Sequence, residues 1–188
     1  MAALLSLILL DCEVVKADNV EGSRNSELDY IWLHQGRANA GPLFGGRKTM
    51  RFNHMELTFP TGTLTKEFRE EIDAFYIPIF GWSALDTEVV GQQCHLLMPD
   101  PDQFILLAES TKPMSSPGYD HLGLLQDTRQ EVDNLLAECE RFAEKDDRVK
   151  IMRYEDLVYP GLTVHAFYVK YLLPIYFDVQ SMERSPAG

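Results

Sequence analysis

Two histidines occupy matching positions in two similar segments of the chain. His54 lies in Phe52-Asn-His-Met-Glu-Leu-Thr58, and His121 lies at the same place in Tyr119-Asp-His-Leu-Gly-Leu-Leu125. A neutral imidazole is the commonest side-chain ligand of metal ions in proteins. One histidine in each half of a duplicated chain therefore predicts a metal or substrate site that the two halves share.

The residues around these histidines predict a strand followed by a helix in each half. Residues 52–59 alternate between apolar and polar side chains, as a half-buried strand does, and His54 is on the polar side. Pro78 and Gly81 predict the end of the first helix, and the capping-box pattern from Thr128 to Glu131 predicts the start of the second. The offset that carries His54 onto His121 also aligns the apolar positions of the two helices: Phe68 with Leu135, Ile72 with Cys139, and Phe75 with Phe142.

Three strand-like runs follow each predicted helix. They lie near 83–90, 92–98 and 104–109 in the first half, and near 149–154, 163–170 and 175–180 in the second, whose first strand is 121–125. The order predicts an α+β fold in which paired βαβββ modules, about 51–110 and 118–181, form one curved mixed sheet around a central cup, with the helices outside. We expect this domain to span residues 50–183, with a short C-terminal tail at 184–188.

With these features the chain resembles the vicinal oxygen chelate superfamily. That superfamily includes glyoxalases, type I extradiol dioxygenases, fosfomycin-resistance proteins and bleomycin-binding proteins. The resemblance covers roughly residues 51–181 and includes the two strand histidines, the stretch Phe80-Gly-Trp82, and Asp100-Pro-Asp-Gln-Phe-Ile-Leu-Leu107 before the last strand of the first module.

The resemblance implies a metal site whose ligands come from the first and last strands of the modules. His54 and His121 match the first-strand positions, and Asp178 matches the acidic position of the last strand. In the first half that position is matched to Leu107, with Glu109 as an alternative ligand. Two histidines and one carboxylate form a facial triad that leaves coordination positions open for a substrate. The cofactor implied is one divalent ion, with iron, manganese, zinc and nickel all compatible.

His165 and Tyr168 are candidates for moving protons beside such an ion. They lie in one predicted strand at positions of opposite parity, so at most one of them faces the cup unless a bulge intervenes. Each histidine also has an ordinary structural alternative, because a strand histidine is more often a surface or hydrogen-bonded residue than a ligand. Trp82, Phe104 and Tyr176 could line a pocket or pack in the core.

These features predict a metal-dependent enzyme of the glyoxalase and dioxygenase type, a lyase or dioxygenase-like catalyst acting on a small molecule with chelating oxygen atoms. The alternative is a metal-free protein of the bleomycin-resistance kind that sequesters a small molecule. A third possibility is a dimeric scaffold of the same fold without catalysis. In each case a small molecule or a second copy, giving a homodimer, is the expected partner.

Composition disfavours other classes of function. The 188 residues carry a net charge of −12 without a basic run, which disfavours nucleic-acid binding. The apolar run 1–10 is too short to span a bilayer and has no basic region before it, so we expect neither an anchor nor a signal peptide. Three widely spaced cysteines are typical of reduced thiols in the cytoplasm. Residues 1–49 read as a poorly structured extension, or as sequence upstream of a natural start at Met50.

Overall fold

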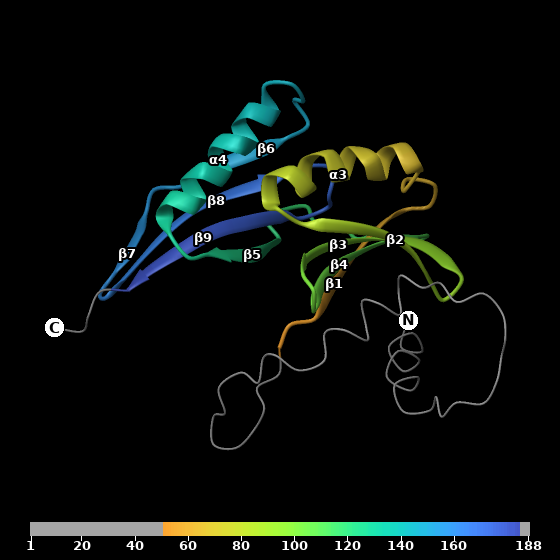
Figure 1. Cartoon of the computed structure of the whole chain (residues 1–188), viewed down its shortest axis with the longest axis horizontal. Coiled ribbons are helices and arrows are strands. Elements are labelled where there is room, and N and C mark those ends of the chain that lie inside the picture. Colours follow the sequence, from red (N-terminus) through yellow and green to blue (C-terminus); the bar gives the residue numbers. More distant parts are fainter. Residues whose placement is uncertain (1–50, 185–188) are drawn as a thin grey trace, which may run out of the picture. The chain divides into compact units, whose positions relative to one another are not determined.

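The computed structural model describes residues 51–184, so the extension predicted at 1–49 and all but Arg184 of the tail predicted at 184–188 lie outside this range. The described part contains two successive modules (Figure 1). The first module consists of β1 (His54–Pro60), α3 (Lys66–Phe80), β2 (Ser83–Val89), β3 (Gln92–Asp100) and β4 (Gln103–Ser110). The second consists of β5 (His121–Gln126), α4 (Arg129–Ala143), β6 (Lys150–Arg153), β7 (Leu157–Tyr159), β8 (Leu162–Lys170) and β9 (Tyr176–Arg184).

Both modules have the same sheet topology. The strand order is β1-β4-β3-β2 in the first and β5-β9-β8-β6 in the second. The first and last strands of each module pair in parallel, and the remaining pairs are antiparallel. The short strand β7, which the sequence did not predict, pairs with β8 beyond the end of β6. The predicted α+β fold of paired βαβββ modules is therefore confirmed.

The strands form two sheets, where the sequence predicted one continuous sheet. Within residues 51–184, hydrogen-bonded pairing joins four strands in one sheet and five in the other, and no ladder links the two. Side-chain packing joins the modules instead, because buried residues of both contribute to one hydrophobic core.

The helices begin and end where their terminal residues satisfy the free backbone groups. The Thr65 side chain accepts from the Phe68 amide at the start of α3, and Thr128 forms the predicted capping box with Glu131 at the start of α4. Gly81, in the left-handed region at φ 68°, ends α3. The prediction that Pro78 also marks the end was wrong by two residues, because Pro78 lies within the last turn and the helix continues to Phe80.

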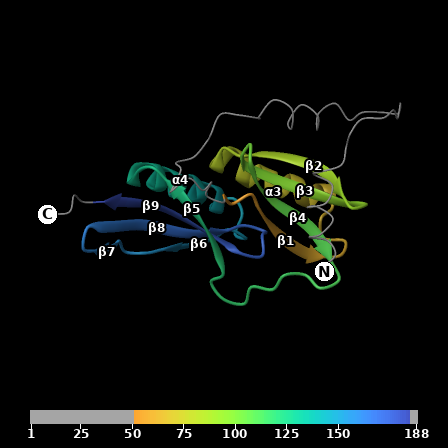
Figure 2. The same cartoon turned by 90° about the horizontal axis from the view of Figure 1, so that it is seen from below.

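Each sheet has one face covered by its helix and one face that no helix of residues 51–184 covers (Figures 1 and 2). Because side chains alternate along a strand, Leu57 and Leu107 point into the core while His54 and Leu106 point to the other side. We call the uncovered sides the open faces of the first and second modules. The candidate ligands on β1, β5 and β9 lie on these open faces.

An aromatic cluster joins the two modules behind the sheets. The Phe75 ring of α3 contacts Phe142 of α4 at a centroid distance of 5.0 Å and Tyr171 at 4.8 Å. The buried Tyr76 hydroxyl donates to the Tyr171 carbonyl at 3.0 Å and accepts from the Tyr171 amide at 3.3 Å. Trp82 packs against Tyr76 in the same cluster, so its role is in the core and not in a pocket.

Two further features of the described residues bear on the earlier expectations. No helix in this part of the chain has the length and apolar character needed to cross a membrane. Cys94 and Cys139 are buried free thiols, as predicted for reduced cysteines.

Replacing Tyr76 with Phe should weaken the junction between the modules. The change leaves the ring in place but removes the hydroxyl to which the Tyr171 amide donates, while the Tyr171 carbonyl keeps its bond from the Leu173 amide at 2.6 Å. Leaving the buried amide unsatisfied should lower the free energy of unfolding by about 1–3 kcal/mol, measured by urea denaturation. Tyr159→Phe, at an exposed position on β7, is the control and should change it by less than about 0.5 kcal/mol. Equal effects of the two substitutions would contradict this role of Tyr76.

Candidate functional site

The open face of the second module brings two predicted ligands together. β5 and β9 pair in parallel, with His121 opposite Tyr176 and Gly123 opposite Asp178. His121 Nε2 lies 3.9 Å from Asp178 Oδ2. Gly123 has no side chain of its own, and the Gln180 side-chain amide lies beside it, 3.4 Å from where a Cβ would be.

A backbone contact fixes the orientation of the His121 ring. Its Nδ1 lies 2.7 Å from the Tyr119 carbonyl oxygen, which can only accept a hydrogen bond. The proton of a neutral imidazole must then be on Nδ1, and Nε2 presents a free lone pair toward Asp178. Metal-binding histidines are commonly oriented by such a hydrogen bond to the other ring nitrogen.

Asp178 is a buried carboxylate without a full set of partners. Only 8% of the residue is exposed, and its Oδ1 has no hydrogen-bond partner. Burial raises the pKa of Asp178, and the nearby His121 and Tyr168 only partly offset this effect. A buried anion with an unpartnered oxygen next to a free imidazole nitrogen fits a cation, so these residues suit the divalent ion that the sequence resemblance implies.

Tyr168 adds a titratable hydroxyl group to this pair. It lies opposite Asp178 on the neighbouring strand β8, and its ring meets His121 edge-on at 4.9 Å. Burial, and secondarily the Asp178 carboxylate, raises the pKa of the Tyr168 hydroxyl, so the group keeps its proton at neutral pH. Tyr154 and Tyr176 flank Tyr168, with ring centroids at 5.0 and 6.5 Å.

His54 lies on the open face of the first module in a similar arrangement. Its ring stacks on Phe104 at 4.9 Å, and Nδ1 contacts Asn53 Oδ1 at 2.9 Å, which leaves Nε2 free. Among residues 51–184, however, no group of three His, Cys, Asp or Glu side chains is close enough to hold an ion. One copy of the described chain thus gathers His121 and Asp178 but does not complete the predicted triad.

The strand register corrects the match in the first module. Asp178 pairs with Gly123, two residues after His121, whereas Leu106 pairs with Glu56, two residues after His54. Leu106, and not Leu107, is therefore equivalent to Asp178. Leu107 points into the core.

Glu109, the alternative ligand, serves a different purpose. Its two carboxylate oxygens accept from the backbone amides of Gly62 at 2.8 Å and Leu64 at 2.7 Å. These contacts hold the turn between β1 and α3. Because Glu109 alternates with Ala108 and Leu106 along β4, its side chain is on the helix-covered side, away from His54.

His165 is likewise on the covered side and cannot act beside His121. Its Nδ1 lies 2.6 Å from Asp156 Oδ1, and its Nε2 lies 2.8 Å from Asp133 Oδ1 on α4. Arg129 contacts Asp156 in the same group at 2.5 Å. Of the two predicted proton carriers, only Tyr168 therefore faces the candidate site, in agreement with the alternation of β8.

The first module repeats this network of one histidine, two aspartates and one arginine. His95 Nε2 lies 2.8 Å from Asp73 on α3, and Nδ1 lies 2.7 Å from Asp86 on β2. Arg69 bonds to Asp86 at 3.1 Å. Hydrogen bonds from His95 and Arg69 outweigh burial and lower the pKa of Asp86. We call these groups the two helix–sheet networks.

The sequence carried a signal for both networks that the single offset between His54 and His121 missed. Arg69 and Asp73 recur as Arg129 and Asp133 at a shorter offset, while Asp86 and His95 recur as Asp156 and His165 at a longer one. The repeated spacings Arg-x₃-Asp and Asp-x₈-His would have identified the networks. They also would have assigned His165 to a structural role.

The chain is similar in structure to several solved proteins. The fosfomycin resistance protein FosX from Listeria monocytogenes, in its monoclinic form, has a TM-score of 0.50 at 13% identity, over 70% of this chain and 90% of that chain. A putative glyoxalase family protein from Bacillus anthracis has a TM-score of 0.48 at 15% identity, over 74% and 98%. A mutant of the same FosX, complexed with Mn(II) and 1S,2S-dihydroxypropylphosphonic acid, has a TM-score of 0.47 at 12% identity, over 70% and 91%.

No protein-family model matches the sequence, and no curated protein does. The likeness to FosX concerns the fold, because a fold is shared by proteins of unrelated activity. The chain has the vicinal oxygen chelate fold that its motifs predict.

Removing His95 should destabilise the protein more than removing His165. The His95 side chain is 3% exposed and the His165 side chain 14% exposed, so removing His95 empties the more deeply buried site, while the aspartates around the two histidines are similarly exposed. We expect His95→Ala to lower the free energy of unfolding by about 2 kcal/mol or more, and His165→Ala by roughly half as much. Urea denaturation measures both, and His54→Ala on the open face is the control. A loss for His54→Ala as large as that for His95→Ala would refute the assignment.

Asp178→Asn should stabilise the metal-free protein at neutral pH. Folding raises the pKa of this carboxyl, so ionising the group costs free energy in the folded protein. The free energy of unfolding of wild type therefore falls as the pH rises above the ordinary carboxyl pKa. The variant should melt a few degrees higher than wild type at pH 7 in the presence of a chelator. The difference should close below the ordinary carboxyl pKa, where Asp178 is protonated in both states.

Glu183→Gln, an exposed position on the same strand, is the control for this pH series. It should melt close to wild type at every pH. A destabilised Asp178→Asn at pH 7 would show that the carboxylate has a compensating partner and would remove the argument for a cation site.

Proposed function

We propose that this protein is a metal-dependent enzyme of the glyoxalase and dioxygenase type, a lyase or dioxygenase-like catalyst. Its substrate is a small molecule with chelating oxygen atoms. The observation that carries the proposal is the pairing of the free His121 Nε2 with the buried Asp178 carboxylate, whose Oδ1 has no partner. The His121 Nε2 and the Asp178 Oδ1 have no hydrogen-bond partner among the described residues, and a divalent cation would stabilise both.

The third ligand in this proposal is His54 of a second copy of the chain. His54 has the same free Nε2 as His121 but lies on the open face of the other module. Two copies related by a twofold axis can place the open face of the first module of each copy against that of the second module of the other. Such a homodimer contains two identical triads, and each draws ligands from both chains.

The metal ion and the surrounding residues have different roles in the proposed reaction. A divalent ion, which could be iron, manganese, zinc or nickel, would stabilise negative charge on the substrate oxygens. Tyr168, protonated at neutral pH, is placed to donate a hydrogen bond or a proton to a substrate atom beside Asp178. Phe104 supports the ring of His54 and holds it in position.

We also propose that the substrate is a small organic molecule and that the enzyme acts in the cytoplasm. FosX, a protein of the same fold, is a fosfomycin resistance protein, and that name is compatible with a small organic substrate. The free thiols of Cys94 and Cys139 agree with the cytoplasm as the site of action.

A mixture of two variants that each bind little metal tests both metal binding and the sharing of the site between two copies. His54→Ala and Asp178→Asn should each lower the uptake of Mn(II) or Zn(II) by one to two orders of magnitude, as disrupted sites do. When the two variants are mixed under conditions that exchange subunits, half of the dimers contain one copy of each. One of the two sites in these dimers is complete, so about a quarter of the wild-type metal content should return. Elemental analysis after dialysis measures it.

The control for mixing is a pair of variants in the same half-site. His121→Ala mixed with Asp178→Asn leaves every site defective and should recover nothing. Wild type that takes up no divalent ion would favour the metal-free binding protein, in which His54 and His121 are polar residues of a pocket. Metal uptake by wild type without recovery in the mixture would place all the ligands in one copy.

A further inference from the structure

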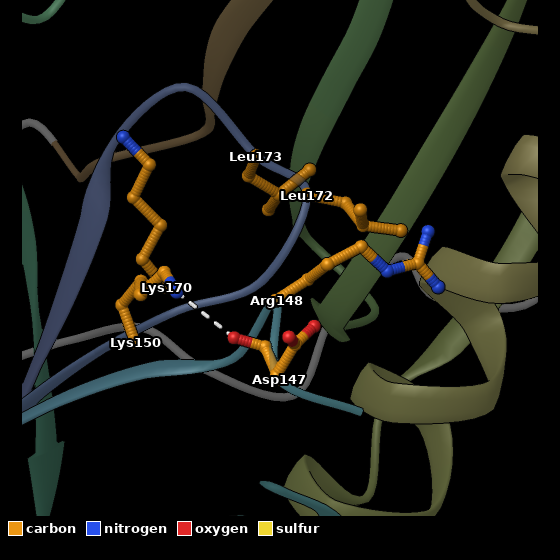
Figure 3. A pocket seen from close by; sticks show the side chains of 6 residues that line it. All are labelled: Asp147, Arg148, Lys150, Lys170, Leu172 and Leu173. Atoms are coloured by element: carbon orange, nitrogen blue, oxygen red, sulfur yellow. Dashed lines mark hydrogen bonds between the residues drawn. The ribbon is translucent and has the colours of Figure 1, made fainter. Parts of the chain in front are cut away.

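A pocket of about 370 Å³ lies where β6, β8 and the turn after β8 meet (Figure 3). Its polar lining carries three cationic side chains and one carboxylate, within a protein of net charge −12. Two leucines supply its apolar part. The lining residues are Asp147, Arg148, Lys150, Lys170, Leu172 and Leu173.

Two of these cations are directly opposed in the sheet. Lys150 on β6 and Lys170 on β8 are partners in the antiparallel ladder, so their side chains leave the sheet on the same side. Like charges directly opposite each other destabilise a strand pair. No carboxylate among the described residues forms an ion pair with either lysine. An anion that bound between them would relieve the repulsion.

The hydrogen bonds of both ammonium groups leave donors available. Lys150 Nζ donates to the Asp147 carbonyl at 2.9 Å, and Lys170 Nζ donates to the Pro174 carbonyl at 2.9 Å. An ammonium group has three N–H donors, so each lysine can still bind an oxyanion. Arg148 is different, because Asp146 and Glu71 already neutralise its guanidinium group.

The lysine pair is continuous with the candidate metal site. Lys170 follows Tyr168 by two residues on β8, so both side chains are on the open face of the second module. The Lys170 ammonium group lies 5.2 Å from the ring of Tyr176, which is opposite His121. Three tyrosine rings, Tyr154, Tyr168 and Tyr176, contact one another between the lysines and Asp178, with Met152 opposite Tyr168, and Tyr154 is 47% exposed.

We propose that Lys150 and Lys170 bind the phosphate or carboxylate group of an aromatic substrate, whose ring rests on the tyrosines between the lysines and Asp178. This substrate class rests on the proposed function in one respect, which is that the other end of the substrate binds the metal ion at Asp178. The recognition by charge and by ring stacking is independent of the metal. Oxyanions accept strong charge-assisted hydrogen bonds from ammonium groups, and aromatic rings add contact area on tyrosine.

Binding of phenyl phosphate to the full chain in EDTA tests the proposal, with NMR titration as the measurement. Phenol, which lacks the anion, and inorganic phosphate, which lacks the ring, should each bind at least about tenfold more weakly. Lys150→Met should weaken phenyl phosphate about tenfold and leave phenol unchanged. The double variant with Lys170→Met should remove the preference for phenyl phosphate over phenol.

Lys66→Met, which removes an exposed charge from α3, is the matched control and should bind phenyl phosphate like wild type. The Lys150→Met single variant guards against a folding defect, because only Lys170 holds the turn at Pro174. Equal binding of phenol and phenyl phosphate by wild type would overturn the proposal. So would unchanged binding in Lys150→Met, or binding that appears only when metal is added. If phenyl phosphate binding depends on the lysines but wild type takes up no metal, this anion site is supported and the proposed metal-dependent function is contradicted.

Discussion

Each module has only one helix for its sheet, and one helix can cover only one face. The covered face carries the core, and the alternation of the strands sends every second side chain to the open face. His54, His121, Tyr168 and Asp178 are all in the second group. The arrangement therefore separates these polar side chains from the core within a single domain.

The same alternation gives the four described histidines two different roles. His95 and His165 lie on covered faces, where both ring nitrogens contact aspartates, and they connect a helix to its sheet. His54 and His121 lie on open faces, where only Nδ1 is engaged. A free lone pair thus distinguishes the two histidines that remain available to a ligand from the two that connect a helix to its sheet.

Periodicity predicted most of the fold, because burial on one face leaves a clear period in the sequence. It failed where local contacts decided the outcome. Strand β7 is three exposed residues that pair with β8, and nothing in its pattern distinguishes it from a loop. The role of Glu109 depends on two backbone amides in a turn, which have no signature in sequence. The sequence predicted that His121 and Asp178 lie on one face, which the strand pairing confirms, whereas no third ligand joins them among residues 51–184.

The two helix–sheet networks have a consequence for how this chain can change. The stretch from His121 to Arg129 is shorter than the equivalent stretch from His54 to Arg69, so the strand-to-helix connection is shorter in the second module. In both modules an arginine and an aspartate of the helix nevertheless contact an aspartate and a histidine outside it, Asp86 with His95 in the first and Asp156 with His165 in the second. Helix position is thereby independent of loop length. Insertions or deletions in these connections, by evolution or by an engineer, can alter the rim of the open faces while the scaffold beneath keeps its register.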